Sequence, residues 1–225
     1  MRDRAVASGS AADRVKIIPN WADPDAVKPV PHAENPLRAE LARDAPCLVM
    51  YSGNIGRGHD VETLVGAARL LRERTDISFL FLGDGAKRRE LELAVRDLPN
   101  VRLGPYQPRE KFAQSLSAAD LHLVSLSAGL EGLLEPSKLY GIMAAGRPAL
   151  FVGPERSEVA RTIHREHCGR TFHNGDAEGL AHAIAALAGD PAAREDMGRR
   201  GREVLVARYS RRVATNSFRN IVSSV

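Results

Sequence analysis

The sequence has little cysteine, few aromatic residues and no long apolar run, and each absence excludes a class of protein. Its two cysteines, Cys47 and Cys168, lie far apart, which argues against a disulfide framework and favours a reducing compartment. No run approaches the roughly 18 apolar residues of a membrane-spanning helix. The first residues, Met1-Arg-Asp-Arg-Ala5, lack the apolar core of a secretion signal. We therefore expect a cytoplasmic protein.

What is present is the composition of an ordinary α/β protein. Of the 225 residues, 44% are hydrophobic and 5% aromatic, and the net charge of +4 is mild. That charge is uneven, because seven arginines lie between Arg199 and Arg219 against one acid, Glu203. A solvated helix face is the simplest interpretation. Contact with an anionic membrane at its inner face is a second hypothesis, and we expect no nucleic-acid partner.

Apolar runs alternate with amphipathic segments along the chain. We predict strands at 15–18, 46–51, 77–82, 101–103, 120–126, 149–152 and 171–172. We predict helices at 37–43, 60–71, 86–97, 108–118, 137–146, 155–166, 176–188, 190–207 and 210–222. Because the strands are almost continuously apolar, they should form a parallel sheet covered by helices on both faces. This predicts an α/β, Rossmann-like fold.

Glycine-rich segments follow one strand after another, at 53–58, 83–85, 104 and 129–132. In a parallel sheet these segments meet at the carboxyl edge, where open α/β sheets bind their ligands. In the segment 131–148, Pro136 or Ser137 can begin a helix and Gly146 can end it. A helix that begins with Ser137 and Lys138 offers backbone N–H groups, a dipole and an ammonium. These features predict a phosphate site.

Several segments, in this order, are similar to one known family. They are Val15-Lys-Ile-Ile-Pro-Asn-Trp-Ala-Asp23, Tyr51-Ser-Gly-Asn-Ile-Gly-Arg-Gly-His-Asp60, Phe79-Leu-Phe-Leu-Gly-Asp-Gly85, Val101-Arg-Leu-Gly-Pro-Tyr106, Ala118-Ala-Asp-Leu-His-Leu-Val124, Pro136-Ser-Lys-Leu-Tyr-Gly-Ile-Met-Ala-Ala-Gly-Arg-Pro148 and 169–187. The chain resembles the C-terminal half of the retaining GT-B glycosyltransferases of family four. The most similar subgroup adds a sugar to a lipid-linked or polysaccharide-precursor acceptor.

The resemblance implies one of the two Rossmann-like halves of a GT-B enzyme. Residues 1–35 would be interdomain segment and linker, 36–190 the donor-binding domain, and 191–225 helices that pack toward the N-terminal half. Only residues 1–14 precede the first matching segment, so we expect that half to be missing or to be a separate chain. The implied substrate is a nucleotide diphosphate sugar, with no cofactor and no catalytic metal. Without its N-terminal half the chain would be inactive.

The same resemblance implies the site residues. Arg57 and Lys138 would be the catalytic cations, although an ordinary helix cap at Ser137 followed by a surface lysine is the alternative for Lys138. The implied donor-binding residues are Gly53, Asn54, Gly56, Gly83, Asp84, Tyr106, Glu131, Glu135, Ser137 and Leu139. The glycines could instead simply make the turns between strands and helices, and Tyr106 could simply pack.

The sequence departs from the family at two positions. Many members carry two glutamates eight residues apart, and here Leu133 and Gly141 stand in their places. Glu131 and Glu135 lie nearby without that spacing. A group of possible metal ligands, His164, His167, Cys168 and His173, lacks a standard zinc spacing, so we predict no metal site. We expect His59 and His122 to be structural.

Two other functions remain open at this point. A non-catalytic nucleotide-binding or scaffolding domain could have the same fold, because fold alone does not determine function. A nucleotide-sugar epimerase half is the other alternative, and it would need a pair of catalytic acids and bases that the sequence does not reveal.

Overall fold

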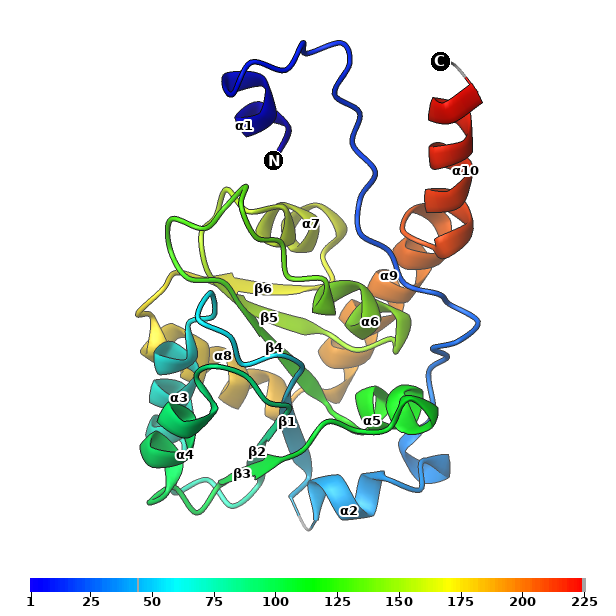
Figure 1. The fold of residues 1–225 in the computed structure, drawn as a ribbon. Coiled ribbons are helices and arrows are strands. Elements are labelled where there is room, and N and C mark those ends of the chain that lie inside the picture. The colour runs from blue at the N-terminus through cyan, green and yellow to red at the C-terminus, as the bar shows by residue number, and fades with distance from the viewer. Residues whose placement is uncertain (44, 224–225) are drawn as a thin grey trace.

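The protein is described here by a computed structural model, which covers residues 1–43 and 45–223. Within these ranges six strands form one sheet with helices on both faces (Figure 1). The strands are β1 (Cys47–Ser52), β2 (Ile77–Leu82), β3 (Val101–Gly104), β4 (Leu121–Ser125), β5 (Ala149–Val152) and β6 (Gly169–Phe172). Their order is β3-β2-β1-β4-β5-β6, and every neighbouring pair is parallel. The predicted Rossmann-like sheet is confirmed.

The central strand β1 shows why the strands are apolar throughout. Val49 and Tyr51 pack on one face of the sheet, in the cluster that contains α3 and α8, whereas Leu48 and Met50 pack on the other. All four side chains are buried. A strand covered on both faces needs apolar residues at every position rather than at alternate ones.

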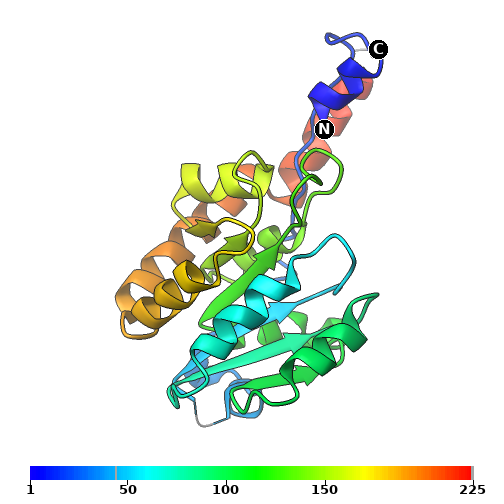
Figure 2. The same cartoon turned by 90° about the vertical axis from the view of Figure 1, so that its left-hand side faces the viewer.

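Helices cover each face as separate groups. On one face lie α3 (Val61–Leu70), α4 (Arg88–Val95) and α8 (Ala177–Ala188), and Figure 2 has this face toward the viewer. On the other lie α2 (Arg38–Ala42), α5 (Phe112–Ala118), α6 (Lys138–Ala144), α7 (Glu158–Glu166) and α9 (Pro191–Arg208). Short 3-10 helices span His32–Glu34 and Arg109–Lys111. The chain also contains α1 (Arg2–Ala7) and α10 (Arg211–Ser223), and both project from the body in Figure 1.

Side-chain caps fix the start of several helices. Asp60 accepts from the backbone N–H of Thr63 and caps α3, as predicted. The predicted cap at Ser137 is different, because its hydroxyl makes no capping hydrogen bond. Ser137 has φ −71° and ψ −12°, which is helical rather than the extended conformation that turns a capping side chain back. At the other end of α6, Gly146 has φ +66°, as expected of a helix-terminating glycine.

The N-terminal segment contains the main error of the sequence prediction. Residues 15–18 form no strand, and the side chain of Ile17 is 64% exposed. The nearby pairing is a single bridge between Ala22 and Ser210, which joins this segment to the start of α10. An apolar run becomes a strand only where another strand can pair with it, and this segment passes outside the sheet. The short helix α1 was not predicted either.

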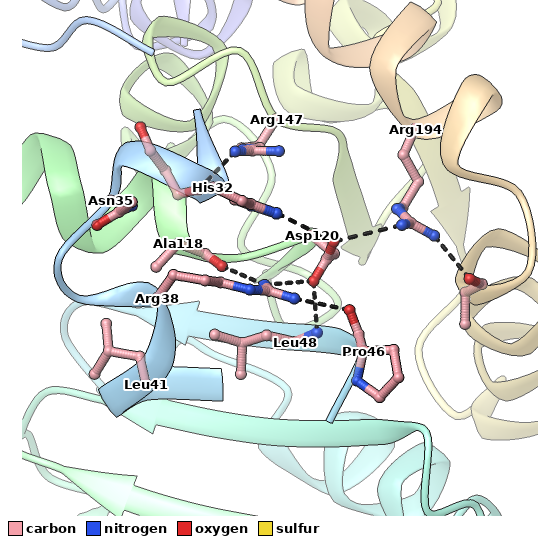
Figure 3. A network of polar contacts seen from close by, with 12 residues as sticks. His32, Asn35, Arg38, Leu41, Pro46, Leu48, Ala118, Asp120, Arg147 and Arg194 are labelled. Carbon is pink, nitrogen blue, oxygen red and sulfur yellow. Dashed lines mark hydrogen bonds and ion pairs between the residues drawn. The ribbon is translucent and has the colours of Figure 1, made fainter. Parts of the chain in front are cut away.

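A buried ion network holds the 32–38 segment to the amino end of the sheet (Figure 3). The carboxylate of Asp120 lies 2.6 Å from the Arg38 guanidinium and 3.4 Å from that of Arg194 in α9. It also accepts from the backbone N–H of Leu48 at 2.8 Å. Asp120 precedes β4 and is only 3% exposed. The network therefore lies at the edge of the sheet opposite the glycine loops.

Helix α9 packs closely on the end of α6. A side chain at Gly198 would overlap the carbonyl oxygen of Gly146, so glycine at position 198 lets the two backbones meet. Arg202 then donates to the carbonyl oxygens of Ala144, Val27 and Pro24 at 2.7–2.9 Å. One guanidinium thus joins the linker to α6 and α9.

The described ranges include all but three residues of the domains predicted at 1–35, 36–190 and 191–225. Residues 44, 224 and 225 lie outside them. Among the described residues, no helix combines the length and apolar character needed to cross a bilayer.

Candidate functional site

The loops after β1 and β2 are in direct backbone contact. Gly53 donates from its N–H to the carbonyl oxygen of Leu82 at 2.9 Å, and Ile55 donates to Asp84 at 2.8 Å. Gly53 and Gly83 have φ of +132° and +136°, which other residues rarely adopt. A side chain on Gly83 would overlap the carbonyl oxygen of Gly53. Glycine is therefore required for the two loops to stack and to present backbone rather than side chains.

A pocket of about 390 Å³ opens beside these loops. It crosses the carboxyl edge of the sheet, because Tyr106 follows β3, Gly53 follows β1, and the segment 134–138 follows β4. Its lining residues are Ser52, Gly53, Asn54, His59, Tyr106, Gln107, Phe112, Leu134, Glu135, Pro136, Ser137 and Lys138. The predicted glycine loop and the predicted phosphate-binding segment thus meet at one cavity.

Lys138 supplies the positive charge of this pocket. Its Nζ donates to the phenol oxygen of Tyr51 at 2.6 Å and to the carbonyl oxygen of Asn54 at 3.1 Å. It also lies 4.1 Å from the centre of the Tyr51 ring. Among the described residues no carboxylate forms an ion pair with it, and burial lowers the pKa of Lys138 to about 7. An anion that entered the pocket would restore the preference for the charged ammonium.

Tyr51 was not identified from the sequence, although it holds Lys138 in position. Its ring is 1% exposed and stacks on Phe81, with ring centres 5.8 Å apart. Its hydroxyl donates to the carbonyl oxygen of Asn54 at 2.7 Å. The usable signal in the sequence was a residue with a polar tip at the end of an otherwise apolar strand.

Glu135 lies in the pocket wall on the β4 side. Its Oε1 is enclosed and has no hydrogen-bond partner within the described part of the chain. Burial and the nearby Glu158 raise the pKa of the Glu135 carboxyl. The backbone N–H groups of Val159 and Glu158 act on the pKa of this carboxyl in the opposite direction. Its second oxygen, Oε1, is the acceptor that remains without a partner among the described residues.

The opposite end of the pocket is aromatic. Tyr106 is 52% exposed and donates from its hydroxyl to the carbonyl oxygen of Asp84 at 3.2 Å. Phe112, at the start of α5, is 39% exposed. A Cβ on Gly141 would lie 3.8 Å from the Phe112 ring. An aromatic surface therefore lies beside the position where many family members have a glutamate, and flat rings are suited to stacking on a base.

The other predicted site residues lie around the pocket rather than in its lining. Arg57 is exposed and, among the described residues, forms no hydrogen bond or ion pair. Leu139 is fully buried in the core and does not line the pocket. The rest shape the adjoining loops: Gly56, Gly83, Asp84 and Glu131.

Two of the residues considered as metal ligands, His164 and Cys168, have defined surroundings in the fold, as does His122. His164 Nε2 lies 2.8 Å from the hydroxyl of Thr171, and Cys168 is buried in the core. Burial raises the pKa of the Cys168 thiol to about 12. His122 lies within β4, and burial lowers its pKa to about 4. Both Cys168 and His122 belong to the packed interior.

The fold is one half of a GT-B architecture. Sucrose-phosphate synthase from Thermosynechococcus elongatus aligns with 100% of this chain at TM-score 0.78 and 23% identity, over 57% of its own length. Alr3699/HepE from Anabaena, in complex with UDP-glucose, aligns with 100% of this chain at TM-score 0.81 and 17% identity, over 61% of its own length.

Residues 34–204 match the family described as glycosyl transferases group 1, and the chain belongs to that family. A putative colanic acid biosynthesis glycosyl transferase, WcaI of Escherichia coli K12, is 32% identical over 165 residues, which are 72% of this chain. A probable glycosyltransferase, WbjE of Pseudomonas aeruginosa, is 30% identical over 89% of this chain. The chain spans 40% and 50% of the length of these two relatives.

Proposed function

We propose that this chain is the donor-binding half of a glycosyltransferase and that its pocket holds a nucleotide diphosphate sugar. The observation that carries the proposal is the ammonium of Lys138. It is partly buried beside the glycine loops, and no carboxylate among the described residues pairs with it. Such an arrangement stabilises an anion with cations and backbone donors.

The position of each part of the donor follows from the order of the lining residues. The diphosphate lies against Lys138 and the Gly53 loop, which are in contact with each other. The nucleobase lies against Tyr106, which follows β3, and the sugar lies toward Glu135 on the β4 side. Ser137, which also lines the pocket, adds a hydroxyl donor next to Lys138.

We propose retaining transfer, in which the bond between the anomeric carbon and the diphosphate breaks and the oxygen of an acceptor hydroxyl bonds to that carbon on the same face. The proton of the acceptor hydroxyl passes to the leaving diphosphate. The leaving diphosphate gains negative charge as that bond breaks. Lys138 stabilises this charge, and preorganised charge stabilisation of this kind accelerates a reaction. Arg57 is the second cation of the proposal, because its unpaired guanidinium is carried by the same glycine loop. In this mechanism protein cations provide the charge, and no cofactor is required.

The acceptor is proposed to be a cell-envelope or exopolysaccharide precursor, in line with the colanic acid role in the name of the Escherichia coli relative. A second domain, at the N-terminal side of a GT-B enzyme, would bind that acceptor, and this chain alone would be inactive. We propose a cytoplasmic location for the chain.

The basic surface beside α10 is the proposed contact with that domain or with an anionic membrane. A hollow of about 500 Å³ lies there between residues 23–25 and α10, and Arg211, Arg212 and Arg219 are among its lining residues. Phe218, in the same helix, is 59% exposed. This hollow is larger than the donor pocket, but it lacks the glycine loops that suit a diphosphate. Liposome sedimentation with and without anionic lipid tests the membrane contact, and equal binding to both would exclude it.

The donor proposal is tested by isothermal titration of the chain with UDP and with GDP. We expect one of them to bind, and Lys138→Ala to weaken that binding about tenfold or more, because hydrogen bonds to charged groups contribute about 1.5–3 kcal/mol. Lys28→Ala is the matched control, since Lys28 is exposed and lies outside the pocket. If the chain is a scaffolding domain that makes no use of Lys138, the Kd of each nucleotide should be the same for the parental chain and for Lys138→Ala.

A further inference from the structure

His59 presents one ring nitrogen to the protein and the other to the donor pocket. The residue is 6% exposed and lines the pocket just before α3. Its Nδ1 lies 2.7 Å from the carbonyl oxygen of Ser125, at the end of β4. Because a carbonyl only accepts hydrogen bonds, Nδ1 must carry the proton, and this assigns the tautomer.

The second nitrogen, Nε2, has no hydrogen-bond partner among the described residues. Nε2 of His32 and Nδ1 of His122 also lack partners, but those two atoms are enclosed by the protein. Nε2 of His59 is not enclosed in this way and remains open to solvent. In the neutral ring Nε2 carries a lone pair, so it offers the pocket a hydrogen-bond acceptor.

The surroundings keep the ring neutral. Burial lowers the pKa of His59, and the positive charges of Lys138 and Lys87 lower it further. Lys87 donates to the backbone carbonyl oxygen of His59 at 3.1 Å, and Tyr51 meets the ring edge-on at 6.1 Å. Lys87 is paired with Glu62 at 2.9 Å, whereas no carboxylate among the described residues pairs with Lys138. A positive charge on the imidazole would therefore be unfavourable chiefly because of Lys138.

The position of His59 selects which part of the donor it can meet. Tyr106 follows β3 at one end of the pocket. His59 is hydrogen-bonded to Ser125 at the end of β4, and the segment that carries Glu135 follows the same strand. Lys138 and the Gly53 loop, which hold the diphosphate in the proposed function, lie between these ends. A neutral acceptor is also unsuited to a phosphate oxygen, which has no proton to donate, and it is suited to a hydroxyl group.

We propose that His59 is a sugar-binding residue, whose Nε2 accepts a hydrogen bond from a hydroxyl group of the transferred sugar. The assignment rests on the proposed function of the pocket and adds the residue that recognises the sugar rather than the nucleotide. It replaces our expectation that His59 has a purely structural role.

Two substitutions separate the two nitrogens. His59→Asn keeps an amide N–H near the position of Nδ1, for the bond to Ser125, and removes the acceptor at Nε2. His59→Gln extends an amide to the position of Nε2. The measurement is the ratio of the dissociation constant of the nucleotide sugar to that of its bare nucleotide. It is determined by titration for the pairs UDP-glucose and UDP, UDP-N-acetylglucosamine and UDP, and GDP-mannose and GDP.

For a pair that binds the parental chain, we expect His59→Asn to raise this ratio about threefold to tenfold, as the loss of one hydrogen bond predicts. The Kd of the bare nucleotide should stay within about twofold, and His59→Gln should recover part of the lost ratio. Thermal unfolding of both variants checks the fold.

Two results would overturn the assignment of His59 while leaving the donor pocket intact. One is an unchanged ratio in His59→Asn for every pair that binds. The other is an equal loss of bare nucleotide and nucleotide sugar, which would mean that His59 only supports the loop. If the parental chain binds none of these compounds, the proposed function itself fails, and the role of His59 fails with it.

Discussion

The ammonium of Lys138 lies 4.1 Å from the centre of the Tyr51 ring and donates to the phenol oxygen of the same residue at 2.6 Å. The two residues come from α6 and β1, which are neighbours only in the folded protein. A phenol and an aromatic face hold a cation without neutralising it. Lys138 is therefore kept in place with a charge that no residue of the pocket cancels.

Lys138→Met should stabilise the protein while it abolishes its use of the pocket. Burial disfavours the ammonium, and an apolar side chain of similar length avoids that desolvation. We expect a gain of about 1 kcal/mol in the free energy of unfolding, as is common when a functional residue that lowers stability is replaced. Urea denaturation at pH 7 measures it. Lys28→Met is the matched substitution at an exposed lysine, and a stability loss specific to Lys138→Met would contradict the argument.

Nucleotide affinity should depend on pH through Lys138. The pKa of this residue is about 7 in the free protein, so raising the pH from 6.5 to 8.5 removes the positive charge from most molecules. We expect the affinity for UDP to fall severalfold over this range in the parental chain. In Lys138→Met only ionisation of the nucleotide should contribute, so subtracting this profile isolates the contribution of Lys138. Parallel profiles in the two proteins would show that another group titrates.

The lowered pKa of Lys138 should affect stability in the opposite direction to nucleotide affinity: stability should rise with pH, whereas affinity falls. An unfolded lysine has a pKa of about 10.4, so between pH 7 and 10 the unfolded chain binds more protons than the folded one. The free energy of unfolding should therefore gain a contribution from Lys138 as the pH rises through this window. Denaturation of the parental chain and of Lys138→Met at several pH values isolates that contribution as their difference.

Gly83→Ala should disrupt the contact between the β1 and β2 loops. The new Cβ would overlap the carbonyl oxygen of Gly53, and φ +136° is unfavourable for alanine. We expect a loss of about 3 kcal/mol or more and loss of nucleotide binding. Gly175→Ala is the control, because Gly175 also has a positive φ but has open space around its Cβ position. Only about 1 kcal/mol should be lost there.

Asp120→Asn should be among the most destabilising single changes in the chain. The carboxylate is buried against Arg38 and Arg194, and its neutralisation leaves two guanidinium groups without their counter-charge. We expect a loss of about 3–5 kcal/mol, measured by thermal or urea unfolding. Asp76→Asn breaks an exposed pair with Arg74 and should cost less than about 1 kcal/mol. Similar losses at the two sites would show that burial does not govern the effect.

Much of the fold was predictable because strands that are buried on both faces of a parallel sheet are apolar at almost every position, and this pattern is visible in the sequence. The strand 77–82 and the strand 149–152 have the predicted bounds, and the cap at Asp60 follows from its position before an apolar helix. The strand predicted at 15–18 failed because pairing is a property of neighbours in space. A run of four residues carries no information about whether a neighbour exists.

The pocket was predictable in part for the same reason. Glycines that follow parallel strands must meet at one edge, so Gly53 and Lys138 could be brought together by topology alone. Tyr51, Gln107 and Phe112 were missed because each lies within or beside an element whose apolar pattern already accounts for it. The tautomer of His59 depends on the carbonyl oxygen of Ser125, which is 66 residues away in the sequence.

The bridge between Ala22 and Ser210 has an optical consequence. Trp21 is the single tryptophan of the sequence, and it immediately precedes this bridge. Trp21 is 47% exposed and lies outside the sheet, and no tryptophan lies in the core of the sheet. Intrinsic fluorescence excited at the red edge of protein absorption therefore reports on the linker beside α10 and is silent about the sheet. Tryptophan fluorescence should therefore report when the linker separates from α10, whereas circular dichroism reports the unfolding of the whole domain.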